Sequence, residues 1–242
     1  MSTIRQLLDS QSRALMAAGA VVVAAAALWI TSDYRDWITF GTGGTPSNPK
    51  GYLKMRKFWF KRLFINNDDL TDGSSLPDEG PSYLPGYVTP RRGGRPERMP
   101  RTLPHRQKPE AIDAKSKKVL HHLGSKLQSE HPDILNLAPS KTEGGTGDAI
   151  YAKEDLPTLN PKAKQVAYEI AHVHPADNSL HVHLSPRDAK MLIEKSWAER
   201  FPVHELGPPQ WVMVYAPRNK EEVDLVEKIM KAAVGWVTGV TI

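Results

Sequence analysis

Residues 171–185 read A-H-V-H-P-A-D-N-S-L-H-V-H-L-S, and the rest of the chain is organised around them. Apolar and polar residues alternate at both ends of this stretch, as they do in half-buried strands. The centre holds Asp177 and Asn178, which favour turns. The stretch therefore predicts a β-hairpin with strands over residues 166–174 and 180–184.

The predicted hairpin carries two H-x-H pairs, His172 with His174 and His181 with His183. Residues two apart on a strand share a face, so both imidazoles of a pair point the same way. With a turn of even length, such as residues 176–179, His174 faces His181, His172 faces His183, and all four rings lie on one side. A turn one residue longer or shorter places the two pairs on opposite sides.

Three interpretations of these imidazoles remain open. Histidine titrates near neutral pH, which favours an acid–base site. A metal site is the runner-up because imidazoles bind zinc and iron, although the carboxylate of a typical catalytic metal site cannot be located in the sequence. Its ligands would be His172, His174, His181 and His183. The third interpretation is an ordinary polar sheet face.

The composition excludes several kinds of chemistry. The 242-residue chain contains no cysteine, which rules out disulfides, thiolate metal ligands and a cysteine nucleophile. Its net charge is +5, but much of the basicity lies in the first half and need not mark the folded domain. The 20 prolines concentrate between residues 46 and 162, which predicts a long extended region before the compact part.

Residues 14–30 carry no charge and predict a membrane-spanning helix. Trp29 and Tyr34 lie near its end, where aromatic side chains gather at membrane surfaces. We expect a single-pass, uncleaved N-terminal anchor in the endoplasmic reticulum membrane, with the following domain facing the cytosol. The alternatives are a cleaved signal peptide, because Arg5 and Arg13 precede the run, and a buried alanine-rich core helix.

Residues 50–64 alternate cations with aromatic residues and predict an amphipathic helix on the membrane surface. Lys54, Lys57 and Lys61 share one face and favour anionic lipid. The opposite face is apolar and consists of Tyr52, Met55, Trp59 and Leu63. We therefore expect membrane lipid as a partner and no nucleic acid, because these aromatics suit burial rather than base stacking.

The signals between this helix and the hairpin are weaker. Residues 65–110 are rich in Pro, Gly and Arg and predict an extended linker. A helix is predicted over residues 111–128, and Pro132 follows its end. Residues 141–148 predict a glycine-rich loop.

The pattern after the hairpin is regular. Ser185-Pro-Arg-Asp188 is a capping box that starts a helix running to about Glu199. Residues 211–215 predict a short apolar strand, and Asn219 caps a final amphipathic helix. This order predicts an α+β fold, a small antiparallel sheet with packed helices, preceded by the transmembrane helix and the extended Pro/Arg-rich segment.

The chain thus divides into three parts. Residues 1–34 form the membrane anchor, and residues 35–108 form a juxtamembrane amphipathic and extended Pro/Gly/Arg-rich region. Residues 109–242 form the α+β domain that contains the hairpin.

From the hairpin onward the sequence resembles the fungal luciferase family. The matching segments are E-I-A-H-V-H at 169–174, L-H at 180–181, Trp197, G-P-P at 207–209, W-V-M-V-Y-A-P-R-N at 211–219 and E-E at 221–222. Upstream, G-Y at 51–52, R-P at 95–96 and H-R-Q at 105–107 are also similar. The resemblance implies a membrane-anchored oxidoreductase of the monooxygenase kind, with O2 as co-substrate, 3-hydroxyhispidin as substrate, and no flavin or metal cofactor. CO2 leaves and an excited product emits light.

Such chemistry needs a base to remove an enol or phenol proton, and donors or a cation to hold the resulting anion. The family pattern makes His172, His174 and His181 the expected catalytic residues. The expected substrate-binding residues are Arg218 against the pyranone oxygens, Tyr215 and Trp211 as flat walls, His183, and Arg95, His105 and Arg106 if the extended segment folds back.

Two differences separate this chain from the luminous members of the family. Its hairpin turn is one residue shorter, and His183 has no counterpart there. We therefore expect a non-luminous homologue acting on a related phenolic, polyketide or lipid-like molecule. The alternatives are a non-catalytic, membrane-tethered small-molecule binding protein and a metal hydrolase that uses the histidines.

Overall fold

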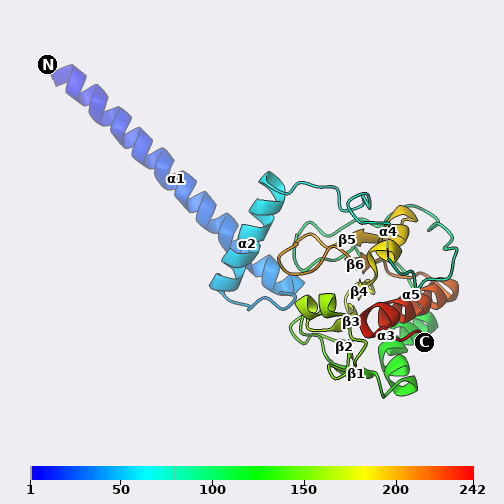
Figure 1. The fold of residues 1–242 in the computed structure, drawn as a ribbon. Coiled ribbons are helices and arrows are strands. Elements are labelled where there is room, and N and C mark those ends of the chain that lie inside the picture. Colours follow the sequence, from blue (N-terminus) through cyan, green and yellow to red (C-terminus); the bar gives the residue numbers. More distant parts are fainter. Residues whose placement is uncertain (1, 79) are drawn as a thin grey trace.

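The structure is a computed structural model that describes residues 2–78 and 80–242 (Figure 1). A long helix, α1 (Ser2–Phe40), projects from a folded body built on a six-stranded antiparallel sheet. Its strands are β1 (Leu135–Pro139), β2 (Asp148–Ala152), β3 (Glu169–Val173), β4 (Leu180–His183), β5 (Ala198–Arg200) and β6 (Trp211–Val214). They lie in the order β1-β2-β3-β4-β6-β5. The predicted α+β fold is therefore confirmed.

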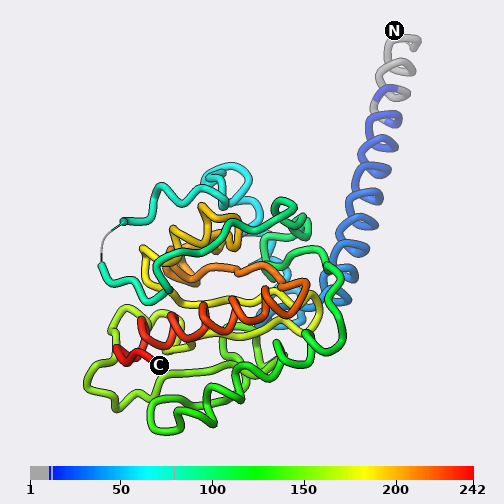
Figure 2. The backbone as a smooth tube through the Cα atoms, turned by 90° about the vertical axis from the view of Figure 1, so that its right-hand side faces the viewer, coloured from blue at the N-terminus to red at the C-terminus, as the bar shows by residue number. Residues whose placement is uncertain are grey.

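The helices on the sheet are α3 (Ala114–Glu130) and α5 (Lys220–Thr238), which lie side by side across one face (Figure 2). Asn219 caps α5 as predicted, because its side-chain oxygen accepts from the Glu222 N–H at 3.0 Å. Apolar side chains of both helices pack with those of β3, β4 and β6 in the main core. Since strand side chains alternate, the hairpin histidines occupy the opposite face of the sheet.

The predicted hairpin is β3 and β4, and its register differs from the expected one. The His174 N–H donates to the Ser179 carbonyl oxygen at 2.8 Å, which leaves four residues in the turn. His172 therefore lies opposite His181, and the expected pairings of His174 with His181 and of His172 with His183 are wrong. The turn still has an even length, so all four imidazoles point to one face.

Two predicted element boundaries are also wrong. A short 3-10 helix at Pro161–Val166 occupies the start of the expected first strand, so β3 begins only at Glu169. Helix α4 (Pro186–Glu194) ends before residue 199, because Ser196 adopts a left-handed conformation with φ of 62°. The chain then turns into the edge strand β5, although the sequence predicted that the helix would continue through its first residues.

The segment expected to be a linker is packed against the domain. Residues 65–110 are irregular as predicted, but Leu76, Leu84 and Val88 are buried in the main core. The Trp197 indole N–H donates to the Thr89 carbonyl oxygen at 2.7 Å, which fastens the segment near β5. The boundary expected at residue 109 therefore does not separate two bodies.

Helix α1 contains one stretch, Arg13–Phe40, that is long and apolar enough to cross a membrane. Length and composition of this kind fit a membrane anchor and a signal sequence alike. The end of α1 contacts α2 (Pro49–Phe64), which is the helix predicted over residues 50–64.

The apolar side of α2 has two parts. Tyr52 and Met55, which were expected to face lipid, are buried against Trp37 of α1 instead. The Trp37 and Tyr52 rings lie 5.8 Å apart between centroids. Phe60 and Phe64 remain 55 % and 64 % exposed, with their ring centroids 4.5 Å apart, and Leu63 is exposed as well. The exposed apolar residues of α2 are therefore these three and do not include Tyr52 or Met55.

Candidate functional site

A β-bulge in β3 brings Glu169 to the histidine face of the sheet. Residues three apart on a regular strand point to opposite faces, so Glu169 and His172 would be separated. The β2–β3 pairing instead shifts between Ile150 and Tyr151, which leaves Ile170 as the extra residue. The Glu169 carboxylate consequently lies 2.5 Å from His172 Nδ1 and accepts from the Tyr151 hydroxyl at 2.8 Å.

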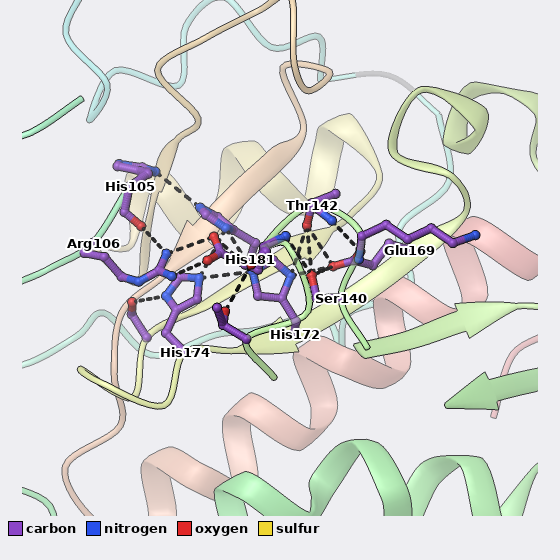
Figure 3. A network of polar contacts seen from close by, with 12 residues as sticks. His105, Arg106, Ser140, Thr142, Glu169, His172, His174 and His181 are labelled. Atoms are coloured by element: carbon purple, nitrogen blue, oxygen red, sulfur yellow. Dashed lines mark hydrogen bonds and ion pairs between the residues drawn. The ribbon is translucent and has the colours of Figure 1, made fainter. Parts of the chain in front are cut away.

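Three imidazoles meet at the centre of the site (Figure 3). His172 Nε2 lies 3.1 Å from His174 Nε2, and His181 Nδ1 lies 3.3 Å from both. All three side chains are buried. The triangle forms because His172 on β3 and His174, one residue beyond its end, lie on one face, and His181 on β4 is opposite His172. We call His172, His174 and His181 the histidine triad.

The two triad members on β3 are held from outside by carboxylates. His172 contacts Glu169 directly through Nδ1. His174 Nδ1 lies 2.8 Å from Ser179 Oγ, and that hydroxyl donates to Asp177 Oδ2 at 2.9 Å. The turn residues of the hairpin thus orient the second imidazole.

The third member of the triad is held by the segment that the sequence predicted as a linker. His181 Nε2 lies 3.4 Å from His105 Nδ1. His105 Nε2 in turn lies 2.6 Å from Glu199 Oε1 on β5. The segment therefore folds back over the sheet and completes the polar network.

A further carboxylate, Glu143, approaches from the glycine-rich loop between β1 and β2. Its Oε1 lies 3.7 Å from His172 Nε2. Arg106 forms a two-pronged ion pair with it, with one N–H···O distance of 3.0 Å. Burial alone would raise the pKa of Glu143, but the contact with His172 and the Arg106 guanidinium hold it far below its usual range. Glu143 is therefore ionised at neutral pH.

The triad imidazoles titrate differently. Burial lowers the pKa of His174 and of His181 well below the usual value, and neighbouring positive charges add to the effect. Both rings are neutral at neutral pH. Burial alone would also lower the pKa of His172, but the carboxylates of Glu143 and Glu169 outweigh it and raise the pKa. The carboxylates of Glu143 and Glu169 therefore place negative charge beside His172, next to the neutral rings of His174 and His181.

A cavity of about 210 Å³ adjoins the triad. Its polar wall includes His181, His105 and Glu143, and its flat walls include Trp211 and Phe201. Two cations, Lys54 of α2 and Lys141 of the glycine-rich loop, also line it. A small anionic molecule in this cavity would meet an imidazole, aromatic faces and positive charge together.

Two glycine loops touch at the edge of this cavity. Gly44, between α1 and α2, has φ of 77°, and Gly144 beside Glu143 has φ of 62°. A Cβ added to Gly44 would lie 2.9 Å from the Thr142 carbonyl oxygen, and one added to Gly144 would lie 2.5 Å from Gly44 Cα. The loop that carries Glu143 therefore packs backbone to backbone against the loop between α1 and α2.

The structure brings most of the predicted site residues together. The group consists of His105, Arg106, His172, His174, His181 and Trp211. Trp211 stacks on His181 with ring centroids 5.6 Å apart and forms a cavity wall, as predicted. Arg106 acts on the triad through Glu143.

The two other predicted arginines lie elsewhere, which corrects their expected role. Arg218 pairs with Glu222 one turn further along α5, and its Nε donates at 3.0 Å. Arg95 donates to the Ala198 and Ile193 carbonyl oxygens at 2.7 and 2.5 Å and holds α4 to β5. The arginine nearest the triad is Arg106, whose guanidinium pairs with Glu143.

Tyr215 and His183 are buried behind the site. Tyr215 donates to Glu199 at 3.0 Å, so it supports His105 rather than forming a cavity wall. His183 lies 3.4 Å from Gln210, and burial lowers its pKa to about 3, so it is a neutral core residue. His183 points to the same face as the triad but does not join it.

Two functional carboxylates were missed by the sequence interpretation. Glu143 stands between a threonine and two glycines, in a segment that the sequence predicts only as a loop. Glu169 lies within the family segment E-I-A-H-V-H, but regular strand alternation assigns it to the wrong face. The one feature of the sequence that could have indicated Glu143 as a site residue is its position as a carboxylate within a glycine-rich loop.

Comparison with known proteins gives one consistent result. Residues 167–233 match the model of the luciferase domain family. The luciferase of Armillaria ostoyae is 31 % identical over 254 residues, which covers 97 % of this chain and 92 % of that protein. The luciferase of Neonothopanus nambi is 28 % identical over 98 % of this chain and 92 % of its own length. No solved structure matches the chain significantly.

Proposed function

Because the chain belongs to the fungal luciferase family, we propose that it is an oxygenase that acts with O2 on a pyrone of the 3-hydroxyhispidin type or a related phenolic. The observation that carries this proposal is the buried histidine triad beside a cavity with aromatic and cationic walls. Oxygen adds to the electron-rich pyrone and CO2 is lost. Each turnover consumes one O2 and releases one CO2 and one ring-opened keto acid.

The residues around the cavity suit the first step, formation of an anion that oxygen can attack. His181 lines the cavity and is neutral, so it can accept a hydrogen bond from an enol or phenol group and orient its proton. Lys54 and Lys141 then hold the negative charge that develops on the pyrone oxygens. Trp211 and Phe201 enclose the flat ring and keep water away from the anion.

We place the protein at the endoplasmic reticulum membrane with its folded body in the cytosol. The apolar helix α1 supplies the anchor. The exposed Phe60 and Phe64 lie on the same helix as Lys57 and Lys61, which suits a surface of anionic lipid. An amphiphilic pyrone dissolved in that membrane reaches the cavity from the side of α2.

The test is direct turnover by the purified full-length protein. We expect 3-hydroxyhispidin to disappear in air with equal uptake of O2, whether or not light is emitted. His181→Gln abolishes this consumption, while His183→Gln on the same strand keeps it, because His183 lies outside the triad and the cavity wall. Circular dichroism of both variants would check that each is folded.

The results separate the candidate functions. Consumption of the pyrone without light supports a non-luminous oxygenase. Tight binding of the pyrone without consumption would replace the oxygenase by a binding protein. If the protein neither binds nor consumes the pyrone, the proposed substrate class is refuted.

A further inference from the structure

The hydrogen-bond partners of the β3 imidazoles determine which of their nitrogens carries a proton. His172 Nδ1 faces the Glu169 carboxylate at 2.5 Å, and an ionised carboxylate only accepts, so Nδ1 bears the hydrogen. Ser179 Oγ gives its own hydrogen to Asp177 and must accept from His174 Nδ1. In both rings the neutral tautomer therefore leaves Nε2, the inner nitrogen, without a hydrogen.

The same reasoning applies to the imidazole on β4. His105 Nε2 faces the Glu199 carboxylate at 2.6 Å and carries the hydrogen, so His105 Nδ1 is an acceptor. His181 Nε2, 3.4 Å away, then donates to it. The inner nitrogen of His181, Nδ1, is consequently also free of hydrogen.

With all three rings neutral, as they must be to bind a metal ion, three nitrogen lone pairs point into one small space. Their separations are 3.1, 3.3 and 3.3 Å. A hydrogen bond needs a donor, and lone pairs at these distances repel one another. A cation at about 2.0–2.1 Å from each nitrogen would bring ligands to about 2.9–3.4 Å from one another, for octahedral and tetrahedral geometry respectively. The observed triangle lies in this range.

A negatively charged oxygen completes the set. Glu143 Oε1 lies 3.7 Å from His172 Nε2, and the four ligand atoms lie within 4.8 Å of one another. The guanidinium of Arg106 fixes the direction of this carboxylate. Outer hydrogen-bond partners, often carboxylates, are typical of histidines that bind metals. Glu169 contacts His172 directly, whereas Asp177 acts on His174 through Ser179 and Glu199 acts on His181 through His105.

We propose that His172 Nε2, His174 Nε2, His181 Nδ1 and a Glu143 carboxylate oxygen bind one divalent first-row transition-metal ion. Three imidazoles and one carboxylate suit Mn²⁺, Fe²⁺, Co²⁺, Ni²⁺, Cu²⁺ or Zn²⁺, whereas Ca²⁺ and Mg²⁺ prefer oxygen ligands. The sequence suggested His183 as a fourth ligand, and the structure supplies Glu143 in its place. The site stands on these four residues and goes beyond the proposed oxygenase function.

Two of the ligands, His181 and Glu143, also line the cavity. The side of the ion next to His181 and Glu143 would therefore face the cavity. His172 and His174, which do not line the cavity, would bind the opposite side of the ion. If the proposed function is correct, an anionic oxygen of the pyrone would reach this side, and His181, with Nδ1 bound to the ion and Nε2 donating to His105, would be a ligand and not a proton acceptor. Metal binding itself does not depend on that function.

The experiment is a titration of the tag-free, full-length protein in detergent after treatment with a chelator. Co²⁺ is the probe, because nitrogen-bound Co²⁺ has visible absorption bands, and Zn²⁺ competes for the same site. We expect about one equivalent of Co²⁺ per chain, displaced by Zn²⁺ and not by excess Mg²⁺. His181→Gln should weaken binding by more than the about 10- to 100-fold that loss of an outer partner typically costs.

His183→Gln is the matched control, because it removes an imidazole from the same strand and face without touching the proposed ligands. Its affinity should equal that of the wild type. Glu143→Gln, an isosteric change in a loop, gives a second loss of affinity if His181→Gln fails to fold. Absence of saturable Co²⁺ binding, or equal losses in His181→Gln and His183→Gln, would overturn the site. Metal binding without pyrone turnover would leave the site intact and refute only the proposed function.

Discussion

The carboxylate of Glu169 joins the glycine-rich loop, β2 and the histidine triad through buried hydrogen bonds. It is completely buried and accepts hydrogen bonds from Ser140, Thr142 and Tyr151 at 2.8–2.9 Å, as well as contacting His172. These contacts tie the glycine-rich loop to β3. Replacement of Glu169 by alanine removes the acceptor and leaves several buried donors without it.

We expect Glu169→Ala to lower the free energy of unfolding by about 3–5 kcal/mol, as is usual when one partner of a buried charged network is removed. A protein of this size loses about 2–4 °C of melting temperature for each kcal/mol, so Tm should fall by about 6–20 °C. Glu169→Gln keeps the volume and one acceptor oxygen, and it should give a smaller decrease. The decrease is measured by circular dichroism during heating of the purified protein in detergent.

Glu227→Ala is the matched control for this change. Glu227 also contacts two partners, Lys126 and Lys231, but these ion pairs lie at the surface. Such pairs contribute about 0–1 kcal/mol, so its Tm should stay within about 4 °C of the wild type. If Glu169→Ala melts at the wild-type temperature, Glu169 does not face the histidines, and the bulge in β3 is wrong.

Three further predictions concern charge and membrane contact. Arg106→Gln should lower pyrone turnover by about 10-fold or more, since Glu143 loses its orientation, while Arg218→Gln should keep the wild-type rate in the same oxygen-uptake assay. Burial alone would raise the pKa of Glu222, but the Arg218 guanidinium holds it below the usual value, so Glu222→Gln should destabilise the protein by about 0.5–1 kcal/mol at pH 7. This difference shrinks as the pH falls below the unfolded pKa of about 4.5 and vanishes below the folded pKa, which urea unfolding at several pH values measures. Phe60→Ser combined with Phe64→Ser should weaken flotation with anionic vesicles at an unchanged Tm, because both side chains are exposed.

The elements that the sequence predicts correctly are those with local signals. The caps at Ser185 and Asn219 and the apolar stripe behind each of them depend on residues within one helical turn. The strands β1, β2 and β5 were missed because each has only three to five residues. Strands this short are stabilised by pairing and packing with neighbouring strands, which leaves little local pattern in the sequence. The packing of the 65–110 segment was missed because its buried residues, Leu76, Leu84 and Val88, are not spaced with the period of a helix or a strand.

The site was predictable only in part. Alternation places the imidazoles of the triad on one face, and that inference needs nothing beyond β3 and β4. Glu143 and His105 reach the triad from distant parts of the chain, and no local pattern links them to it. Arg218 was assigned to the substrate although Glu222, four residues later, already offered a partner on the same helix face.

The contact between Gly44 and Gly144 limits how a soluble version of this protein can be made. Deletion of the chain up to residue 45 would remove the surface against which the Glu143 loop rests, together with part of the cavity wall. Polar replacements on the projecting part of α1, with residues 34–64 left unchanged, would improve solubility and retain that support. Shortened versions of the chain should therefore keep the loop between α1 and α2 together with both helix ends that it joins.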